Sequence, residues 1–106
     1  MLTRRNLISS AILAIATRPA FAKPTTHHVD ILNFEFTPKF LAVDVGDKVV
    51  FTNKDVVPHT VSSVNADWGS GNLVKDAEWT FNVTQRGDLN YFCKHHPVMQ
   101  GTLISS

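Results

Sequence analysis

The sequence contains one cysteine, Cys93, among 106 residues, so a disulfide within the chain is excluded. It has no cluster or stripe of basic residues, and therefore no electrostatic footprint for nucleic acid. No segment repeats its apolar residues with a convincing helical period. After residue 22 no apolar run is long enough to cross a bilayer. These absences disfavour a disulfide framework, nucleic-acid binding and an α-helical fold.

The first 22 residues have the layout of a secretory signal peptide. The positively charged start MLTRR precedes an apolar run, Leu7–Ala16, which is too short to span a bilayer, and Ala20–Ala22 offers small residues for cleavage. A buried N-terminal helix is the weaker alternative, because no amphipathic period runs through the segment. We predict a signal peptide over residues 1–22 and export to the periplasm. The paired arginines also fit twin-arginine export, so that route and the Sec route both stay open.

Residues 23–106, which cleavage would leave, suffice for one compact domain and not for two. Three arginines leave with the signal peptide, so seven basic residues face nine acidic ones and the formal net charge becomes −2. Export also bears on Cys93, because cysteines outside the cytoplasm usually pair. Without a partner in its own chain, Cys93 is predicted to be an intermolecular bridge, a reactive thiol or a metal ligand.

Strand patterns separated by turn residues run through the rest of the chain. Apolar and β-branched stretches cover residues 27–36, 40–45, 48–53, 59–64, 79–84, 89–93 and 101–105. Inward-facing positions are predicted for Val29, Ile31, Trp79, Phe81, Val83, Leu89 and Tyr91. Gly46 and Asp47 predict a hairpin or a tight corner, and the Gly-rich residues 65–76 predict a loop with at most a short strand. Seven or eight short strands indicate an all-β sandwich or barrel.

The segment YFCKHHPVMQG, residues 91–101, gathers thiol, imidazole and thioether donors. Cys93, His96 and Met99 follow one another at intervals of three, on a predicted tight turn after a strand. One short loop cannot wrap a metal ion, so a fourth ligand must come from elsewhere. His59 is the candidate, because Pro58 stiffens the chain before it. Two imidazoles, a thiolate and a thioether are the ligand set of a blue-copper electron-transfer centre.

The segments PHTV (58–61) and YFCKHHPVMQGTL (91–103) resemble the cupredoxins, and within them the amicyanin group, with its short Cys-x-x-His-x-x-Met spacing and a proline after the second histidine. The resemblance implies a plastocyanin-like copper-binding domain over residues 23–106, folded as a Greek-key β-sandwich of seven or eight strands. It further implies one type 1 copper ion held by His59, Cys93, His96 and Met99, with Met99 axial.

The resemblance also implies a function: a carrier, not an enzyme, that shuttles single electrons between redox partners such as a c-type cytochrome or a periplasmic dehydrogenase or oxidase. We expect the ring edge of His96 to reach the surface inside an apolar rim of Pro58, Pro97 and Val98, which would suit brief docking. A monomer is expected, because the pattern shows no long hydrophobic surface.

Two positions depart from the pattern of that group. Thr60 stands where asparagine often follows the first histidine and helps to tie the two ligand segments together. The Thr60 hydroxyl can still hydrogen-bond and its backbone N–H can still point at the thiolate, but a looser tie is expected. His95 stands where proline is common, and its restored N–H is expected to approach the sulfur and raise the reduction potential.

Three other functions are conceivable for the same residues. A copper carrier or storage protein could use identical ligands. An enzyme with Cys93 as nucleophile beside a histidine leaves Met99 idle, and the sequence shows no obvious group to orient the histidine. Structural zinc seldom takes methionine.

Overall fold

The computed structural model describes residues 23–106, and the predicted signal peptide lies outside them. The described residues form eight strands: β1 Thr26–Leu32, β2 Glu35–Thr37, β3 Phe40–Val43, β4 Lys48–Asn53, β5 Ser62–Ser63, β6 Glu78–Asn82, β7 Gly87–Cys93 and β8 His96–Ser105. Among residues 23–106 we find no helix with the length and apolar character that a membrane span requires.

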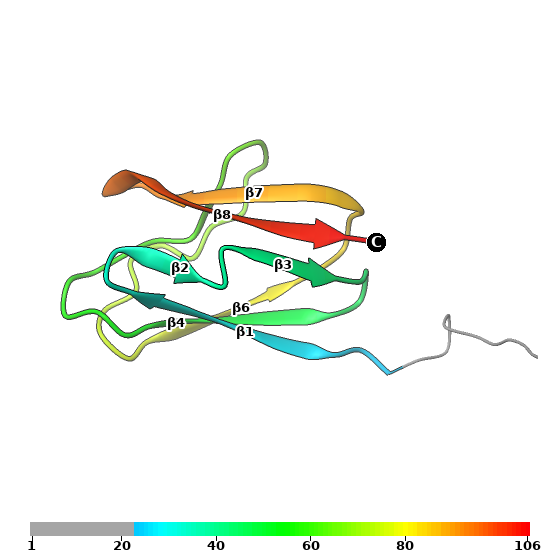
Figure 1. The fold of residues 1–106 in the computed structure, drawn as a ribbon, viewed down its shortest axis with the longest axis horizontal. Coiled ribbons are helices and arrows are strands. Elements are labelled where there is room, and N and C mark those ends of the chain that lie inside the picture. The colour runs from blue at the N-terminus through cyan, green and yellow to red at the C-terminus, as the bar shows by residue number, and fades with distance from the viewer. Residues whose placement is uncertain (1–22) are drawn as a thin grey trace, which may run out of the picture.

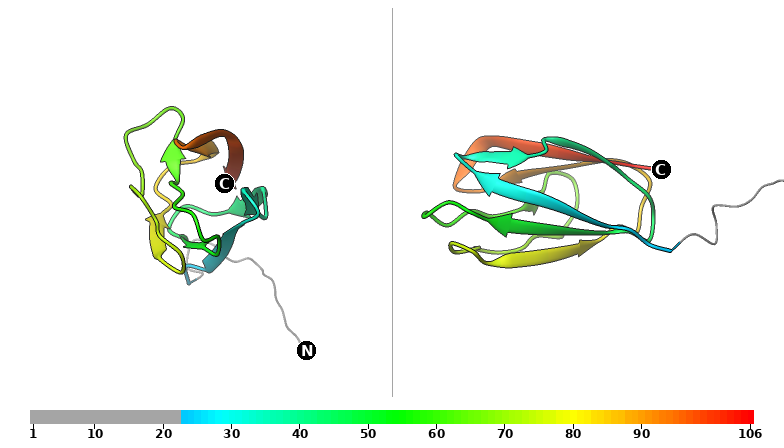
Figure 2. Two further views of the ribbon diagram at one scale, coloured as in Figure 1. Left: turned by 90° about the vertical axis from the view of Figure 1, so that its left-hand side faces the viewer. Right: turned by 60° about the horizontal axis from the view of Figure 1, so that its bottom comes forward.

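Two four-stranded sheets make up the fold, with strand orders β2-β1-β4-β6 and β3-β8-β7-β5 (Figure 1). Each sheet is mixed, because β1 runs parallel to β4 and β3 runs parallel to β8, while the other neighbours are antiparallel. The two layers are also visible in both views of Figure 2. The predicted all-β sandwich is confirmed.

The core lies between the sheets and is built from the inward-facing residues that alternate along the strands. Val29 and Ile31 are completely buried, and Phe81 and Val83 are also buried, as the alternation predicts. Trp79 and Leu89 are half-buried and pack against the same core. Side chains of this size contribute about 1.5–3 kcal/mol each when they are buried.

Tyr91 occupies the centre of the core and requires a glycine opposite it. Its ring contacts Phe36 and Phe51 edge-on, at centroid distances of 4.8 and 5.2 Å. In the β7–β8 register Tyr91 pairs with Gly101. A Cβ atom at position 101 would lie 2.5 Å from the tyrosine ring, so only glycine leaves room for it. This pair fixes the register of the two strands that lead into and out of the predicted ligand loop.

The turn at Gly46 is a corner between the two sheets. The strand before it, β3, pairs with β8, whereas the strand after it, β4, pairs with β1 and β6. Gly46 has φ of 99°, a conformation that favours glycine. Asp47 closes the corner: its carboxylate accepts the backbone N–H groups of Asp44 and Thr25 and contacts Nε2 of His27 at 2.8 Å. Of the two geometries predicted here, the structure has the tight corner.

Two predicted strands are interrupted or shortened. The run at residues 27–36 breaks after Leu32, where Asn33 and Phe34 adopt φ values of 55° and 60° and reverse the chain into β2. Of the run at 59–64, only Ser62 and Ser63 are strand residues. In contrast, β8 begins five residues earlier than the predicted strand at 101–105 and includes His96. The break at residues 33–34 and the shortened run at residues 59–64 both lie close to the predicted site.

Candidate metal centre

Cys93 and His96 face each other across the β7–β8 turn. Cys93 is the last residue of β7 and His96 the first of β8, and the two are partners in the register. Only Lys94 and His95 separate them, so a tight turn joins these two residues as predicted, whereas Met99, predicted on the same turn, lies within β8. The register shifts between Phe92 and Cys93, and such a bulge re-aims the side chains that follow it.

His59 reaches the same place from the segment between β4 and β5. Its backbone exchanges two hydrogen bonds with Leu73, at 3.1 and 2.8 Å, which hold it as an isolated bridge. The buried amide of Asn53 supports both sides of this bridge, donating to the carbonyl of Val57 at 2.9 Å and to that of Leu73 at 2.7 Å. His59 was predicted to begin a strand. It is instead fixed by this isolated bridge to Leu73.

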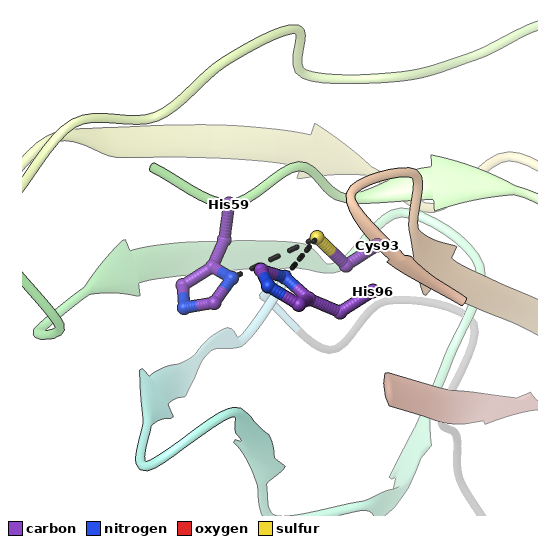
Figure 3. A group of neighbouring side chains, drawn as sticks. All are labelled: His59, Cys93 and His96. Atoms are coloured by element: carbon purple, nitrogen blue, oxygen red, sulfur yellow. Dashed lines mark hydrogen bonds between the residues drawn. The ribbon is translucent and has the colours of Figure 1, made fainter. Parts of the chain in front are cut away.

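Three donor atoms converge at this end of the sandwich. Nδ1 of His59 lies 3.7 Å from Sγ of Cys93, and Nδ1 of His96 lies 3.9 Å from the same sulfur. One donor atom from each residue lies within 4.8 Å of the others. Figure 3 shows the sulfur pointing toward both rings. With metal–nitrogen and metal–sulfur bonds of about 2.0 and 2.3 Å, ligands of one ion stand about 3.5–4 Å apart, so this donor set fits a metal.

Met99, the predicted fourth ligand, is buried on β8 three residues beyond His96. It lines a hollow together with Phe34, Phe36 and Val98. The structure therefore brings three of the four predicted residues together and sets the fourth on the same strand as His96. Its role as an axial ligand stays a prediction.

Thr60 joins the two ligand segments. Its backbone N–H points at Sγ of Cys93, 3.4 Å away, and its hydroxyl accepts the backbone N–H of Lys94 at 2.9 Å. The hydroxyl also contacts that of Ser62 at 3.0 Å. Both contacts expected of Thr60, through its backbone N–H and through its hydroxyl, are therefore present.

His95 does not have the predicted contact. Within residues 23–106 the backbone N–H that is hydrogen-bonded to the sulfur belongs to Thr60, and that of His95 makes no such bond. The His95 ring instead lies 2.6 Å from Oδ1 of Asn72, through Nε2. The N–H of Lys94, the other residue of this turn, donates to Oγ1 of Thr60 at 2.9 Å. The expected effect of His95 on the potential therefore has no structural basis.

Exposure differs sharply between the donors. His59 and Cys93 are completely buried, whereas His96 is half-buried. Pro58, Pro97 and Val98 are exposed, and Val98 is 91% exposed. His96 also borders an open hollow lined by Val57, Pro58, Asn72 and His95. The donors are thus shielded from water except where the ring of His96 approaches the surface.

Two neighbours of the centre were missed by sequence reasoning. Asp55 lies 2.8 Å from Nε2 of His59 through Oδ2, and the ring of Phe34 meets those of His59 and His96 edge-on, at 5.3 and 4.9 Å. Burial raises the pKa of Asp55, but hydrogen bonds from the backbones of Phe34 and Asn33 and from His59 outweigh it, so its pKa lies below the ordinary value. The spacing of four between Asp55 and His59 was visible in the sequence, whereas nothing there connects Phe34 to either histidine.

Comparison with known proteins agrees with this geometry. A model of the cupredoxin-like domain matches residues 6–105. The chain belongs to the cupredoxin-like family. Among cupredoxin-like relatives, it is 31% identical over 81 residues to amicyanin of Paracoccus denitrificans, in a match that covers 72% of this chain and 62% of that protein. The chain thus matches less than two thirds of the length of this relative.

Solved structures of amicyanin variants share the cupredoxin-like fold. A Cu(I) form of one variant superposes with a TM-score of 0.73 at 26% identity, covering 85% of this chain and 90% of the other. An oxidized form of another variant has a TM-score of 0.72 at 28% identity, covering 76% and 82% of the two chains. The cupredoxin-like fold over most of the described chain is therefore shown independently of the donor cluster.

Proposed function

We propose that this protein is an exported type 1 blue copper protein that shuttles single electrons between redox partners. The observation that carries the proposal is the convergence of His59, Cys93 and His96, with their donor atoms within 4.8 Å of one another. Met99 is proposed as the fourth, axial ligand. Copper bound to these residues supplies a one-electron couple between Cu(I) and Cu(II).

The donor types suit both oxidation states of copper. Thiolate and thioether are soft ligands that favour Cu(I), and imidazole also accepts Cu(II). His59 is held by its two backbone hydrogen bonds with Leu73, and Cys93 and His96 are held by the pairing of β7 with β8. Ligands that are fixed in this way change position little when the charge of the site changes. A small reorganisation favours fast electron transfer.

The surroundings of His96 suit brief contact with a partner. His96 is the half-buried donor, and the exposed side chains of Pro58, Pro97 and Val98 supply the apolar surface near it. Weak redox encounters bury little area, so a small patch is sufficient. A c-type cytochrome or a periplasmic dehydrogenase or oxidase is the proposed partner class. Export to the periplasm rests on the signal-peptide pattern of residues 1–22.

A cysteine-nucleophile enzyme is the strongest rival, because Asp55, His59 and Cys93 lie in the order of a catalytic triad. The sequence-based objection that no acidic residue orients the histidine was therefore wrong. The burial of Cys93 is the better objection: it is 0% exposed, whereas reactive cysteines are partially exposed. A second imidazole beside the same sulfur also has no task in that chemistry.

The test is the colour of the purified protein. Loaded with Cu(II), it is expected to be intensely blue through thiolate-to-copper charge transfer, and to bleach when a reductant is added. Cys93→Ser should bind copper weakly and stay colourless. A colourless wild-type protein would contradict the proposal and favour the enzyme or zinc alternatives.

A further inference from the structure

The carboxylate of Asp55 connects two parts of the molecule that meet at the metal centre. Oδ2 contacts Nε2 of His59 at 2.8 Å and accepts the backbone N–H of Phe34 at 3.0 Å. Oδ1 accepts the backbone N–H of Asn33 at 2.8 Å. The backbone N–H of Asp55 in turn donates to the buried side chain of Asn53 at 2.9 Å, which fixes the carboxylate in place.

The contact with His59 determines which ring nitrogen carries the proton. An ionised carboxylate only accepts hydrogen bonds, so Nε2 of His59 must donate. In a neutral imidazole the other nitrogen then has a free lone pair, and this is Nδ1, which lies 3.7 Å from Sγ of Cys93. Asp55 therefore selects the tautomer in which His59 presents a ligand atom toward the sulfur.

The contacts with Asn33 and Phe34 determine what covers the centre. Both residues have positive φ, 55° and 60°, which is uncommon for a residue as bulky as phenylalanine. The two backbone N–H groups of this turn are directed at the Asp55 carboxylate, which offsets the strain. In this conformation the ring of Phe34 lies edge-on against the imidazoles of His59 and His96.

We propose that Asp55 is a positioning residue of the metal centre: one carboxylate fixes the ligand tautomer of His59 and holds Phe34, through the β1–β2 turn, over both histidines. The proposal rests on the proposed copper function. It has two consequences for bound copper, one for the reduction potential and one for the rate at which the metal is released. A negative charge behind one ligand stabilises Cu(II) more than Cu(I), and a held cover slows the escape of the metal.

Asp47 offers a matched control. It accepts two backbone N–H groups and contacts Nε2 of His27 at 2.8 Å, the same three kinds of partner as Asp55. It lies at the other end of the six-residue strand β4, roughly 20 Å away at about 3.3 Å per residue. Asp55→Asn and Asp47→Asn thus remove the same charge and the same kind of contact, one beside the metal centre and one remote from it.

The first experiment compares the copper-loaded variants. Removing a hydrogen-bonding partner of a metal ligand typically costs 10–100-fold in metal affinity. For Asp55→Asn we expect about tenfold faster copper release to a chelator. We also expect a preferential loss of Cu(II) affinity of about tenfold, which raises the one-electron potential by about 59 mV. Asp47→Asn should match wild type in both. Equal potentials and release rates in the two variants would overturn the proposal, since a merely structural carboxylate lowers stability alone.

Two further measurements do not use the Asp55 variant, and the first of them needs no copper. Nitrogen-15 NMR of the metal-free wild-type protein should show His59 protonated at Nε2, with that proton protected from exchange; protonation at Nδ1 would overturn the proposal. Phe34→Ala should release copper faster and leave the His59 ring proton in place, and an unchanged release rate would remove the covering role. A wild-type protein that is not blue would contradict the copper function, while the NMR result would still decide whether Asp55 selects the tautomer.

Discussion

Thr60 donates its backbone N–H to Sγ of Cys93 at 3.4 Å, although 33 residues separate the two in the sequence. The same residue accepts the backbone N–H of Lys94 through its hydroxyl. One threonine therefore holds the segment of the first histidine against the loop that carries the other donors. The bond to the sulfur uses the backbone and survives side-chain substitution, whereas the bond to Lys94 does not.

Thr60→Val should separate these two contributions. Valine keeps the volume of threonine but leaves the partly buried N–H of Lys94 without its partner, and the loss of such a hydrogen bond costs about 0.5–1.5 kcal/mol. Urea unfolding of the metal-free protein measures this loss. Thr102→Val is the control, because Thr102 donates to Asn90 at an exposed position and should change stability by less than about 0.5 kcal/mol. Equal losses in the two variants would show that the tie through Thr60 is not special.

Gly101→Ala should destabilise the strands that lead to the ligand loop. The added Cβ would lie 2.5 Å from the ring of Tyr91, in the centre of the core. Overpacking of this kind costs about 1–3 kcal/mol, and the urea midpoint of the metal-free protein should fall accordingly. Gly69→Ala is the control, because its nearest neighbour would be the carbonyl oxygen of Val61 at 3.5 Å, an ordinary contact. A loss in Gly69→Ala as large as in Gly101→Ala would contradict the prediction.

The sequence was most informative where neighbours in space are neighbours along the chain. Cys93 and His96 belong to one turn, and the alternation in β1 marked Val29 and Ile31 as core. The contact between Asp55 and Phe34 was not predictable in this way. The left-handed conformation of Phe34 has no side-chain signature, and it persists because a carboxylate 21 residues away accepts its N–H group.

The corner at Gly46 shows the same limit in the topology. A turn between two β-branched runs is compatible with a hairpin or with a crossing between sheets. The outcome depends on which strands pair with β3 and β4, and those partners, β8 on one side and β1 and β6 on the other, are remote in sequence. Local turn residues could not decide between the two.

Asp47 should make the free energy of unfolding depend on pH in the acidic range. Burial raises its pKa, but hydrogen bonds from His27, Thr25 and Asp44 and the charge of His27 outweigh this, so its folded-state pKa lies below the ordinary 3.8. A lowered folded-state pKa contributes stability above pH 3.8 that is lost as the pH falls through the folded-state pKa. Asp47→Asn should therefore be less stable than wild type at pH 7, and the difference in unfolding free energy should shrink below about pH 4. A difference that is constant from pH 7 to pH 3 would exclude this linkage.

Met99→Leu should test the fourth ligand without disturbing the core, since leucine conserves volume and costs under about 1.5 kcal/mol. If the thioether donates to copper, its removal disfavours the more positive Cu(II), and the reduction potential should rise while the protein stays blue. Voltammetry and the visible spectrum provide the two readouts. A potential and spectrum identical to those of wild type would show that Met99 is only a core residue.

Val98→Asp should slow electron exchange with a partner and leave the copper site unchanged. Val98 is 91% exposed, so the aspartate costs little stability, and it lies two residues from His96. A charge in an apolar docking patch must be desolvated on contact, which should reduce the bimolecular rate while the potential stays constant.

Val45→Asp is the control: Val45 is 46% exposed and lies in the corner at the far end of β4. Stopped-flow oxidation of the reduced protein by a c-type cytochrome measures both variants at one ionic strength, because the added charge also changes long-range attraction. Equal slowing would indicate a net-charge effect, and no slowing in Val98→Asp would place the docking surface away from His96.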